Sequence, residues 1–351
     1  MPIDEQQLRR IARAIFAATG SDEDEATIVS DHLVEANLRG HDSHGVGLIP
    51  LYVRDRQAGH LHPNRHPVLV REDGPIAHFD AMNGYGHVAA REATQYGIAK
   101  ARESGVAVVG LKNSHHIARV GTYGEQACAA GITAVIFASV FAGRQMVAPH
   151  GGTDGRLHTN PICVAVPTGA GEAPFVLDFA TSQIAMGKVR VAHNKGTTVD
   201  AGVLLDAQGK PTTNPAVLFE EPVGSLLSFG GHKGSGLAVM CELLAGAMLG
   251  GPTNQMTDPP GRGLMNNMLA IFIDPGRFGE PSFIRGEVDA ILAHVKASPA
   301  ADPSRPVLVA GEPERTVRAE RLAKGIPLDE RSWREILSAA AAVGVSADVC
   351  R

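Results

Sequence analysis

The sequence predicts an α/β protein in which a central sheet lobe is joined to a helical lobe formed by both ends of the chain. Three observations predict this class. Apolar runs of strand length alternate with helical segments through the middle, both ends are rich in helical periodicity, and 351 residues exceed what one small core accommodates. We place the helical lobe at residues 1–75 with about 300–351, and the α/β lobe at 76–299.

Three helices are expected near the N-terminus, over residues 4–19, 22–39 and about 48–58. Ser21 has the side chain of a good N-cap for the second helix, which carries acidic residues in its first turn. Gly40 is a natural stop for the same helix, and Pro50 is tolerated in the first turn of the third. The tail is helical again, over about 283–297, 313–324 and 331–343.

The central part of the chain predicts a sheet with helices packed on it. Short apolar runs indicate strands at 67–71, 76–80, 106–111, 132–139, 162–167, 175–180 and 267–274. Longer periodic segments indicate helices at 87–104 and 232–250, and a further helix is expected directly after the segment KNSHHIARVG. Strands that alternate with helices are typical of an α/β core.

Composition restricts the class of protein. The formal net charge is −5 and no dense Lys/Arg patch is present, so nucleic-acid binding is not expected. The N-terminus lacks the apolar core of a signal peptide, and no apolar segment approaches the ~20 residues that span a membrane. The four cysteines form no C-x-x-C pair and indicate reduced thiols in a cytoplasmic protein: Cys128, Cys163, Cys241 and Cys350.

A partial dinucleotide fingerprint lies between a predicted strand and a predicted helix. Gly84, Gly86 and Ala89 form a G-x-G-x-x-A pattern, which in a Rossmann unit places a pyrophosphate at the helix N-terminus. The fingerprint also requires an acid at the end of the next strand, where this chain has Lys112 and Asn113. We therefore interpret the glycines as space at a helix entrance rather than as a Rossmann site.

Two glycine-flanked turns carry pairs of histidines, GHDSHG with His41 and His44 and KNSHH with His115 and His116. A single histidine in such a turn is usually structural, but several polar turns beside apolar runs favour convergence on one cleft. Zinc is the alternative, with Asp42 as a further ligand, yet the spacing matches no zinc motif. Because the pKa of histidine is ordinarily ~6.5, proton transfer fits better, and no metal site is expected.

An anion site is indicated beside this acid–base chemistry. Lys233 lies at the predicted N-terminal end of a long helix, where a cation and backbone N–H groups attract an anion such as a phosphate. Asp178 ends the apolar run FVLDF, where its carboxylate can accept hydrogen bonds from a ribose or an amide. The residues themselves lead no further than an acid–base site next to an anion site.

Several segments together resemble the type 2 malate/L-lactate dehydrogenase family, which is distinct from the Rossmann-fold lactate and malate dehydrogenases. They occur in family order over about residues 5–345: HDSHGVG with PLYVR, NSHHIARVGTYGEQ, VAPHGGTDGRLHTNPICVAVPT, LDFATSQIAMGKV, GKPTTNP, GGHKGSGLAVMCELLAG and RLAKGIPL. The resemblance implies a non-Rossmann α/β fold with a central mixed sheet. It also implies an NAD- or NADP-dependent enzyme of 2-oxo and 2-hydroxy acids, a cofactor held in the α/β lobe, and a homodimer.

The resemblance also assigns roles to individual residues. It maps the usual proton donor of the family onto His44, and a second histidine, catalytic in some members, onto His116. The residues expected to line the cofactor are Asp178, Ala180, Thr181, Ser182, His232 and Lys233. Those expected on the substrate side are Leu48, Tyr52, Arg119, Thr159 and Asn160.

One position departs from the family pattern. Many members carry an arginine four residues after the SHG histidine, thought to hold the substrate carboxylate, and this chain has Leu48 there. An apolar side chain suits a larger or less acidic substituent than the second carboxylate of malate. Arg119, Arg144 or Arg156 would have to supply the missing cation, and the sequence leaves the three open.

The sequence thus predicts a cytoplasmic NAD- or NADP-dependent 2-hydroxy-acid dehydrogenase. Hydride would pass between C4 of the nicotinamide and C2 of the substrate. His44 would protonate the substrate oxygen during reduction, while His116 binds or polarises the same oxygen. An imine or amino-acid reductase on the same scaffold, and a non-catalytic nucleotide-binding protein, are the alternatives.

Overall fold

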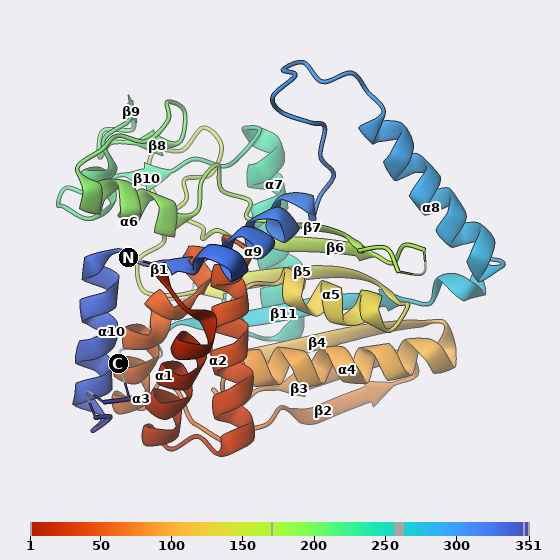
Figure 1. The fold of residues 1–351 in the computed structure, drawn as a ribbon, viewed down its shortest axis with the longest axis horizontal. Coiled ribbons are helices and arrows are strands. Elements are labelled where there is room, and N and C mark those ends of the chain that lie inside the picture. Colours follow the sequence, from red (N-terminus) through yellow and green to blue (C-terminus); the bar gives the residue numbers. More distant parts are fainter. Residues whose placement is uncertain (1, 170, 256–262, 347, 350–351) are drawn as a thin grey trace.

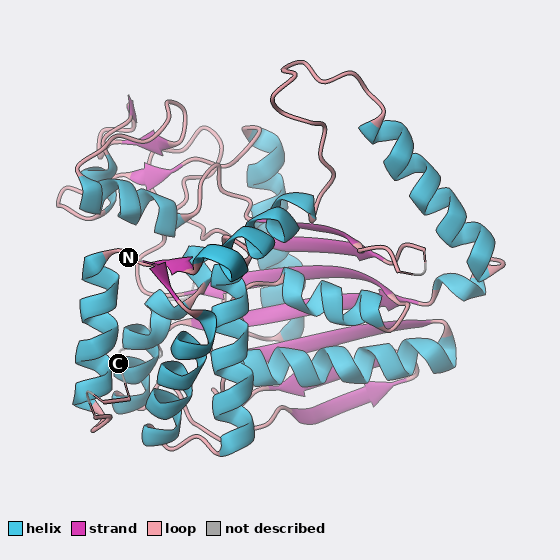
Figure 2. Ribbon diagram, in the orientation of Figure 1, coloured by secondary structure: helices cyan, strands magenta, loops and turns pink. Residues whose placement is uncertain are grey.

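The computed structural model describes residues 2–169, 171–255, 263–346 and 348–349. A seven-stranded sheet lies at its centre, with α4 (Gly86–Ser104) and α5 (Gly121–Ala129) on one face (Figure 1). Helices from both chain ends stand beside one end of the sheet, and α8 (Pro281–Lys296) projects away from the body (Figure 2). The helix expected after the segment KNSHHIARVG is α5.

The central sheet is mixed, as the resemblance implies. Its strands, in spatial order, are β2 (Val68–Asp73), β3 (Ile76–Asp80), β4 (Val106–Ser114), β11 (Met265–Ile273), β5 (Thr133–Phe141), β6 (Ile162–Val166) and β7 (Phe175–Phe179). β3 and β4 are parallel and are joined by α4, whereas every other neighbouring pair of these strands is antiparallel. The core between sheet and helices includes Val109, Leu111, Met268, Ala270 and Phe272, all fully buried.

The helical lobe is built by both chain ends. It contains α1 (Glu5–Ala18), α2 (Glu23–Leu38), α3 (Ile49–Gln57) and α10 (Glu330–Ala342), with β1 (Pro2–Ile3) paired to β12 (Ile326–Pro327). Residues such as Ile11, Leu33 and Ile336 meet in one buried cluster. α9 (Glu312–Lys324) ties the two ends together, because Arg318 pairs with Glu35 of α2 at 3.0 Å.

The predicted N-cap of α2 is wrong by one residue. Asp22 rather than Ser21 caps the helix, since its side chain accepts a hydrogen bond from the Glu25 N–H at 2.8 Å. The Ser21 hydroxyl instead donates to the Glu25 carboxylate at 2.7 Å. Both residue types are good N-caps, so their local preference did not distinguish them.

A second, smaller core interrupts the region that the sequence assigns to a single α/β lobe. It includes Val147, Val189, Leu204 and Leu226 and lies under α6 (Met186–Lys195) and a small sheet. That sheet consists of β8 (Leu204–Leu205), β9 (Pro211–Thr212) and β10 (Ser225–Leu226). The sequence does not predict these elements, because strands of two residues show no periodicity. The lobe boundaries near residues 75 and 300 stay a prediction.

The single helix predicted over 232–250 is three consecutive helical segments. α7 (His232–Cys241) continues into a π-helical turn (Glu242–Gly246) and then a 3-10 turn (Ala247–Leu249). The widening coincides with Glu242, whose carboxylate is buried and bonded to Asn160 and Asn254 rather than directed to solvent. π-turns of this kind often occur at functional sites.

Two further features of the described chain are the length and hydropathy of its helices and the state of its thiols. No helix in these ranges is both long and apolar enough to cross a membrane. Cys128, Cys163 and Cys241 are buried, unpaired thiols, whereas Cys350 lies outside the described residues. Burial raises the pKa of Cys128 and Cys241 to about 12, so neither is a reactive thiolate near neutral pH.

Candidate active site

The first histidine turn is fixed by the end of α2. His44 ends the short helical turn η1 (Asp42–His44), and the Asn37 side chain accepts a hydrogen bond from the Val46 N–H at 2.8 Å. Asn37 also donates to Asp42 at 2.7 Å, and Arg321 of α9 donates to the same carboxylate at 2.6 and 3.0 Å. The Asp42 carboxylate is therefore occupied by hydrogen bonds that hold the turn.

The second histidine turn follows β4 and is held by close packing against α4. A Cβ atom on Gly86 would overlap the carbonyl oxygens of both His115 and His116, so only glycine allows this approach. The glycine pattern that resembles a dinucleotide fingerprint thus serves helix packing. His115 is 1 % exposed, and its Nε2 lies 3.0 Å from Asp55 Oδ2, which marks it as a structural residue.

The two turns bring His44 and His116 together. Their ring centroids lie 5.6 Å apart with an angle of 15° between the planes, so the rings stack. Nδ1 of His44 lies 2.9 Å from Ser43 Oγ, and Nδ1 of His116 lies 2.7 Å from the Tyr52 hydroxyl. The two Nε2 atoms form no hydrogen bond with any described residue, and both rings are only half-buried.

Electrostatics keep both imidazoles neutral. Burial, followed by His41 and Arg119, lowers the pKa of His44 to about 4. Burial, followed by His44 and His115, holds the pKa of His116 well below its usual range. At neutral pH each ring therefore has one N–H donor and one nitrogen acceptor, and a nearby anion would be needed to favour the charged form.

Two buried histidines that the sequence did not single out lie behind this pair. The His32 and His87 rings lie 4.9 Å apart, and the His87 ring is 5.6 Å from that of Tyr52. Burial lowers the pKa of His32 to about 3 and that of His87 well below normal. The Tyr52 ring thus packs against histidine rings, and its hydroxyl lies 2.7 Å from Nδ1 of His116. His32 lies within α2, whereas His87 lies in the first turn of α4, inside the glycine pattern that was interpreted only as a helix entrance.

A buried charge network lies beside the pair. Arg119 is 2 % exposed, and its Nη2 lies 3.0 Å from Glu125 Oε1 while its Nε lies 3.9 Å from Asp178 Oδ2. The same Asp178 oxygen accepts a hydrogen bond from the Gly121 N–H, at the start of α5, at 2.7 Å. Burial raises the pKa of Asp178, and Arg119 opposes that shift. Two acids thus flank Arg119, which the sequence offered as a holder of the substrate carboxylate.

The other residues predicted to line a cofactor converge on the N-terminus of α7. Thr181 accepts a hydrogen bond from the Phe229 N–H at 3.1 Å, and Ser182 pairs with Ser228 in an antiparallel bridge. Ala180 is half-buried in the same segment. His232 and Lys233 follow as the first residues of α7, both exposed. The fold therefore joins two segments that lie about fifty residues apart in the sequence.

The residues predicted on the substrate side have different environments. Leu48 is half-buried and packs against the helical core. Thr159 uses its carbonyl oxygen to accept two hydrogen bonds from Thr181, at 2.8 and 2.9 Å. Asn160 is fully buried, and its side chain donates to Ala238 and Glu242 and accepts from Val140. Tyr52 is fully buried and contacts His116 instead of an open cleft.

The two remaining candidate arginines lie at the surface. Arg144 is exposed and donates to the Leu218 carbonyl at 2.7 Å. Arg156 is paired with Asp154 at 2.7 Å, with 68 % of its side chain exposed. Neither forms an interaction with the stacked histidines in the described chain.

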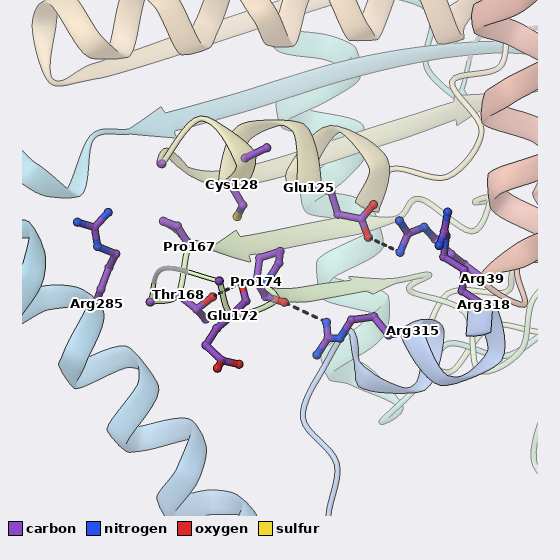
Figure 3. Close-up of a pocket in the computed structure, with 14 residues that line it drawn as sticks. Arg39, Glu125, Cys128, Pro167, Thr168, Glu172, Pro174, Arg285, Arg315 and Arg318 are labelled. Atoms are coloured by element: carbon purple, nitrogen blue, oxygen red, sulfur yellow. Dashed lines mark hydrogen bonds and ion pairs between the residues drawn. The ribbon is translucent and has the colours of Figure 1, made fainter. Parts of the chain in front are cut away.

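A cavity of about 620 Å³ opens on the far side of the charge network (Figure 3). Its wall is rich in arginine and includes Arg39, Arg285, Arg315 and Arg318, and it contains Glu125. Glu125 forms an ion pair with Arg39 at 3.2 Å and accepts a hydrogen bond from Arg119 at 3.0 Å, so it joins the cavity to the charge network that includes Asp178. His44 and His116 are not among the residues that line this cavity, so the cavity is separate from the stacked histidines.

Metal ligation was the sequence alternative for the histidine turns. Within the described ranges, no group of three or more His, Cys, Asp or Glu side chains is placed to hold a metal ion. His41 approaches Glu314 at 3.5 Å, Asp42 contacts Asn37 and Arg321, and His115 pairs with Asp55. The partners of these side chains are thus other protein groups.

Comparison with known proteins places the chain in a family. Residues 3–337 match the malate/L-lactate dehydrogenase family. Hydroxycarboxylate dehydrogenase B of Escherichia coli K12 is 48 % identical over 97 % of this chain and 94 % of its own length. An L-lactate dehydrogenase of Cupriavidus necator is 37 % identical over 99 % of both chains. A solved structure of a putative malate/lactate dehydrogenase from E. coli superposes with a TM-score of 0.94, at 46 % identity over 100 % of this chain and 97 % of that one.

The fold and the family match thus define an α/β oxidoreductase without a Rossmann unit, whose substrates are small hydroxy or oxo acids. The chain belongs to the malate/L-lactate dehydrogenase family. It is therefore a hydroxycarboxylate dehydrogenase.

Proposed function

We propose that the protein interconverts a 2-oxo acid and a 2-hydroxy acid with NAD(H) or NADP(H), in the cytoplasm, and that His44 is the proton donor. The observation that carries this proposal is the stacked pair, in which each Nδ1 is held by a protein hydroxyl and neither Nε2 has a hydrogen-bond partner in the described part of the chain. Two free imidazole nitrogens side by side suit a single substrate oxygen that gains or loses a proton.

The residues around Asp178 and α7 fit a nicotinamide dinucleotide. Among the described residues, the buried polar atoms without a hydrogen-bond partner include Nε and Nη1 of Arg119 beside Asp178 and Oγ of Ser228 just before α7. Such orphaned groups are costly in a finished interior, and a ligand rich in hydroxyl and phosphate oxygens would satisfy them. Lys233 adds an exposed cation at the start of α7.

The hydroxyl partners of the two histidines decide which nitrogen each ring presents. If Tyr52 donates its O–H to Nδ1 of His116, the neutral ring carries its proton on Nε2 and can donate to the substrate oxygen. Ser43 similarly holds Nδ1 of His44 and directs Nε2 to the same side. A bound nicotinamide supplies the hydride for reduction, and His44 delivers or removes the proton at the oxygen.

The lowered pKa of His44 predicts opposite pH profiles for the two directions. With a pKa of about 4, His44 is almost entirely neutral at pH 7, ready to accept a proton but not to donate one. We expect kcat/KM for 2-oxo acid reduction to fall about tenfold per pH unit above about pH 5. The value for 2-hydroxy acid oxidation should stay constant there and fall below about pH 4. Initial rates across pH 4–8 measure both, and a reduction rate that is flat up to pH 7 would contradict the assignment.

A panel of substrates tests the activity itself. Oxidation of NADH and NADPH is followed with oxaloacetate, pyruvate, 2-oxoglutarate and phenylpyruvate, each with and without an amine. Turnover of a 2-oxo acid without amine supports the dehydrogenase. Turnover that requires an amine or a cyclic imine would identify a reductase of imines, and no turnover at all would leave a nucleotide-binding protein.

The identity of residue 48 predicts the substrate preference. Because Leu48 offers no cation to a second carboxylate, the wild type should prefer phenylpyruvate over oxaloacetate. Leu48→Arg should shift the ratio of specificity constants towards oxaloacetate by about tenfold, since arginine binds a carboxylate in bidentate fashion. Leu48→Met is the control that keeps an apolar side chain. An unchanged ratio in Leu48→Arg would show that residue 48 only packs against the helical core.

We further propose that the protein is a homodimer and that α8 contributes to the interface. α8 has 16 residues and none is buried, although Ile284, Val288, Ile291 and Val295 form one apolar stripe. The first two are half-buried against the body, whereas Ile291 is 56 % and Val295 44 % exposed. An apolar stripe that continues past the body, together with Phe283 at 67 % exposure, is typical of a surface covered by another chain.

Ile291→Glu is therefore expected to shift the protein to monomers, because it places a charge in the apolar stripe. Light scattering coupled to size exclusion measures the mass of each species. Ala293→Glu is the matched control, since it adds the same charge to the opposite side of α8 and should leave the dimer intact. A monomeric wild type, or equal dissociation by both variants, would contradict the role of α8.

A further inference from the structure

We propose that Glu242 is a positioning residue of the cofactor cleft, whose buried carboxylate fixes the place of Thr181 relative to Lys233. This inference rests on the proposed function, because it assumes that the segment 180–182 and the start of α7 hold a nicotinamide cofactor. It concerns the π-helical turn, which neither the stacked histidines nor the charge network explains.

The Glu242 carboxylate is 8 % exposed and is surrounded by hydrogen-bond donors. Its Oε1 accepts from Asn160 Nδ2 at 2.9 Å and from Asn254 Nδ2 at 2.7 Å, and its Oε2 accepts from the Asn254 N–H at 3.0 Å. None of the ion pairs found among the described residues includes this carboxylate. A buried charge held only by neutral amides is costly and calls for a function beyond packing.

Asn160 transmits the position of this carboxylate to neighbouring elements. Its Oδ1 accepts from the Val140 N–H at 3.0 Å, and its Nδ2 also donates to the Ala238 carbonyl in α7 at 3.1 Å. Its backbone has a φ of 27°, which is unusual for a residue with a side chain. A side chain with every polar atom engaged keeps the backbone in this conformation.

The strained backbone at Asn160 in turn holds Thr181. The Thr181 hydroxyl donates to the carbonyls of Thr159 at 2.9 Å and Asn160 at 3.2 Å. The Thr181 carbonyl then accepts from the Phe229 N–H, just before α7 begins. Glu242 follows the last residue of α7, and Lys233 is in its first turn, so one carboxylate is linked to both sides of the proposed cleft.

The pattern of donors explains why residue 242 is an acid. All three groups that meet its oxygens are N–H donors, so a glutamine would direct its own N–H groups at one of them. Asn254 would have to rotate its amide to accept from a glutamine. That rotation would give up the hydrogen bond from Asn254 Nδ2 to the Val140 carbonyl, now 3.1 Å long.

Glu242→Gln tests the proposal, and Glu25→Gln is its matched control. Glu25 is also a buried acid, 3 % exposed, and its carboxylate accepts hydrogen bonds from two neutral donors, the Ser21 hydroxyl and the Asn64 N–H. Burial raises the pKa of both carboxyls. Glu25 lies in the helical lobe, so its replacement should lower thermal stability in a similar way without reaching the cofactor cleft.

Fluorescence titration should show that Glu242→Gln binds NADH about tenfold more weakly. Its KM for the 2-oxo acid at saturating cofactor should stay within about twofold of wild type, and Glu25→Gln should bind NADH normally. If Glu242→Gln does not fold, Asn254→Ala is the second variant, because it removes one hydrogen-bond donor from the same carboxylate. It should lower the affinity for NADH by about fivefold.

Equal NADH affinity in wild type and Glu242→Gln would overturn the inference and leave the proposed function standing. Equal weakening by Glu25→Gln would overturn it too, because the effect would then follow from lost stability alone. A wild type that binds neither NADH nor NADPH would instead overturn the proposed function and this inference with it.

Discussion

His44→Ala is expected to lower turnover by ~100- to 10,000-fold, the usual loss when a positioned general acid or base is removed. The side chain stacks on His116 and is held through Nδ1 by Ser43, so its Nε2 is the proton-transferring atom of the proposed mechanism. Among the described residues, His44 forms no hydrogen bond or ion pair with Asp178 or Lys233. The dissociation constant for NADH should therefore stay within about twofold of wild type.

Steady-state rates with the best 2-oxo acid, together with NADH titration, measure the two effects separately. His66→Ala is the control, because that histidine is exposed and paired with Glu92 outside the site. If the turnover of His44→Ala is within a few-fold of wild type, the role of proton donor would have to be assigned to His116 instead. In that case Tyr52→Phe, which removes the hydroxyl on Nδ1 of His116, should show the larger loss.

Much of the fold is visible in the sequence because its elements are long and periodic. β5 and β11 are nine-residue strands that each contain an apolar run, and α1 and α4 have clear caps or stops. The small sheet of β8, β9 and β10 is invisible because each strand has two residues and owes its pairing to tertiary contacts. The choice of Asp22 over Ser21 as N-cap likewise depends on Glu25, which attracts the serine hydroxyl.

The sequence predicted which residues belong to the candidate site better than it predicted their hydrogen-bond and ion-pair partners. Polar turns after apolar runs point to His44 and His116, and the fold does bring them together. Tyr52 lies 64 positions before His116, and no local pattern shows that its hydroxyl would reach that ring. Arg119 was predicted from its charge, but Glu125 and Asp178 compete for that charge in three dimensions. Such pairings depend on the fold and have no signature in one segment.

The hydrogen bonds at the start of α7 weaken one of the two reasons for expecting an anion at Lys233, the free backbone N–H groups of a helix N-terminus. The N–H groups of Lys233, Gly234 and Ser235 already donate to carbonyls of residues 229–231, at 3.1 to 3.3 Å. The N-cap, Gly231, offers no side chain, so the free backbone donors of this helix end are few. The exposed ammonium of Lys233 must then contribute most of the attraction for a cofactor phosphate.

Lys233→Ala is therefore expected to weaken NADH and NADPH binding by roughly 10- to 150-fold, which corresponds to ~1.5–3 kcal/mol for one charge-assisted hydrogen bond. The KM for the 2-oxo acid should change little at saturating cofactor. Lys233→Arg, which keeps the charge, should retain most of the affinity, and Lys195→Ala, at the exposed end of α6, is the control. Because ion pairs are screened, salt should weaken NADH binding to the wild type more than to Lys233→Ala. Unchanged dissociation constants for both dinucleotides, with the same salt dependence, would exclude Lys233 from the cofactor site.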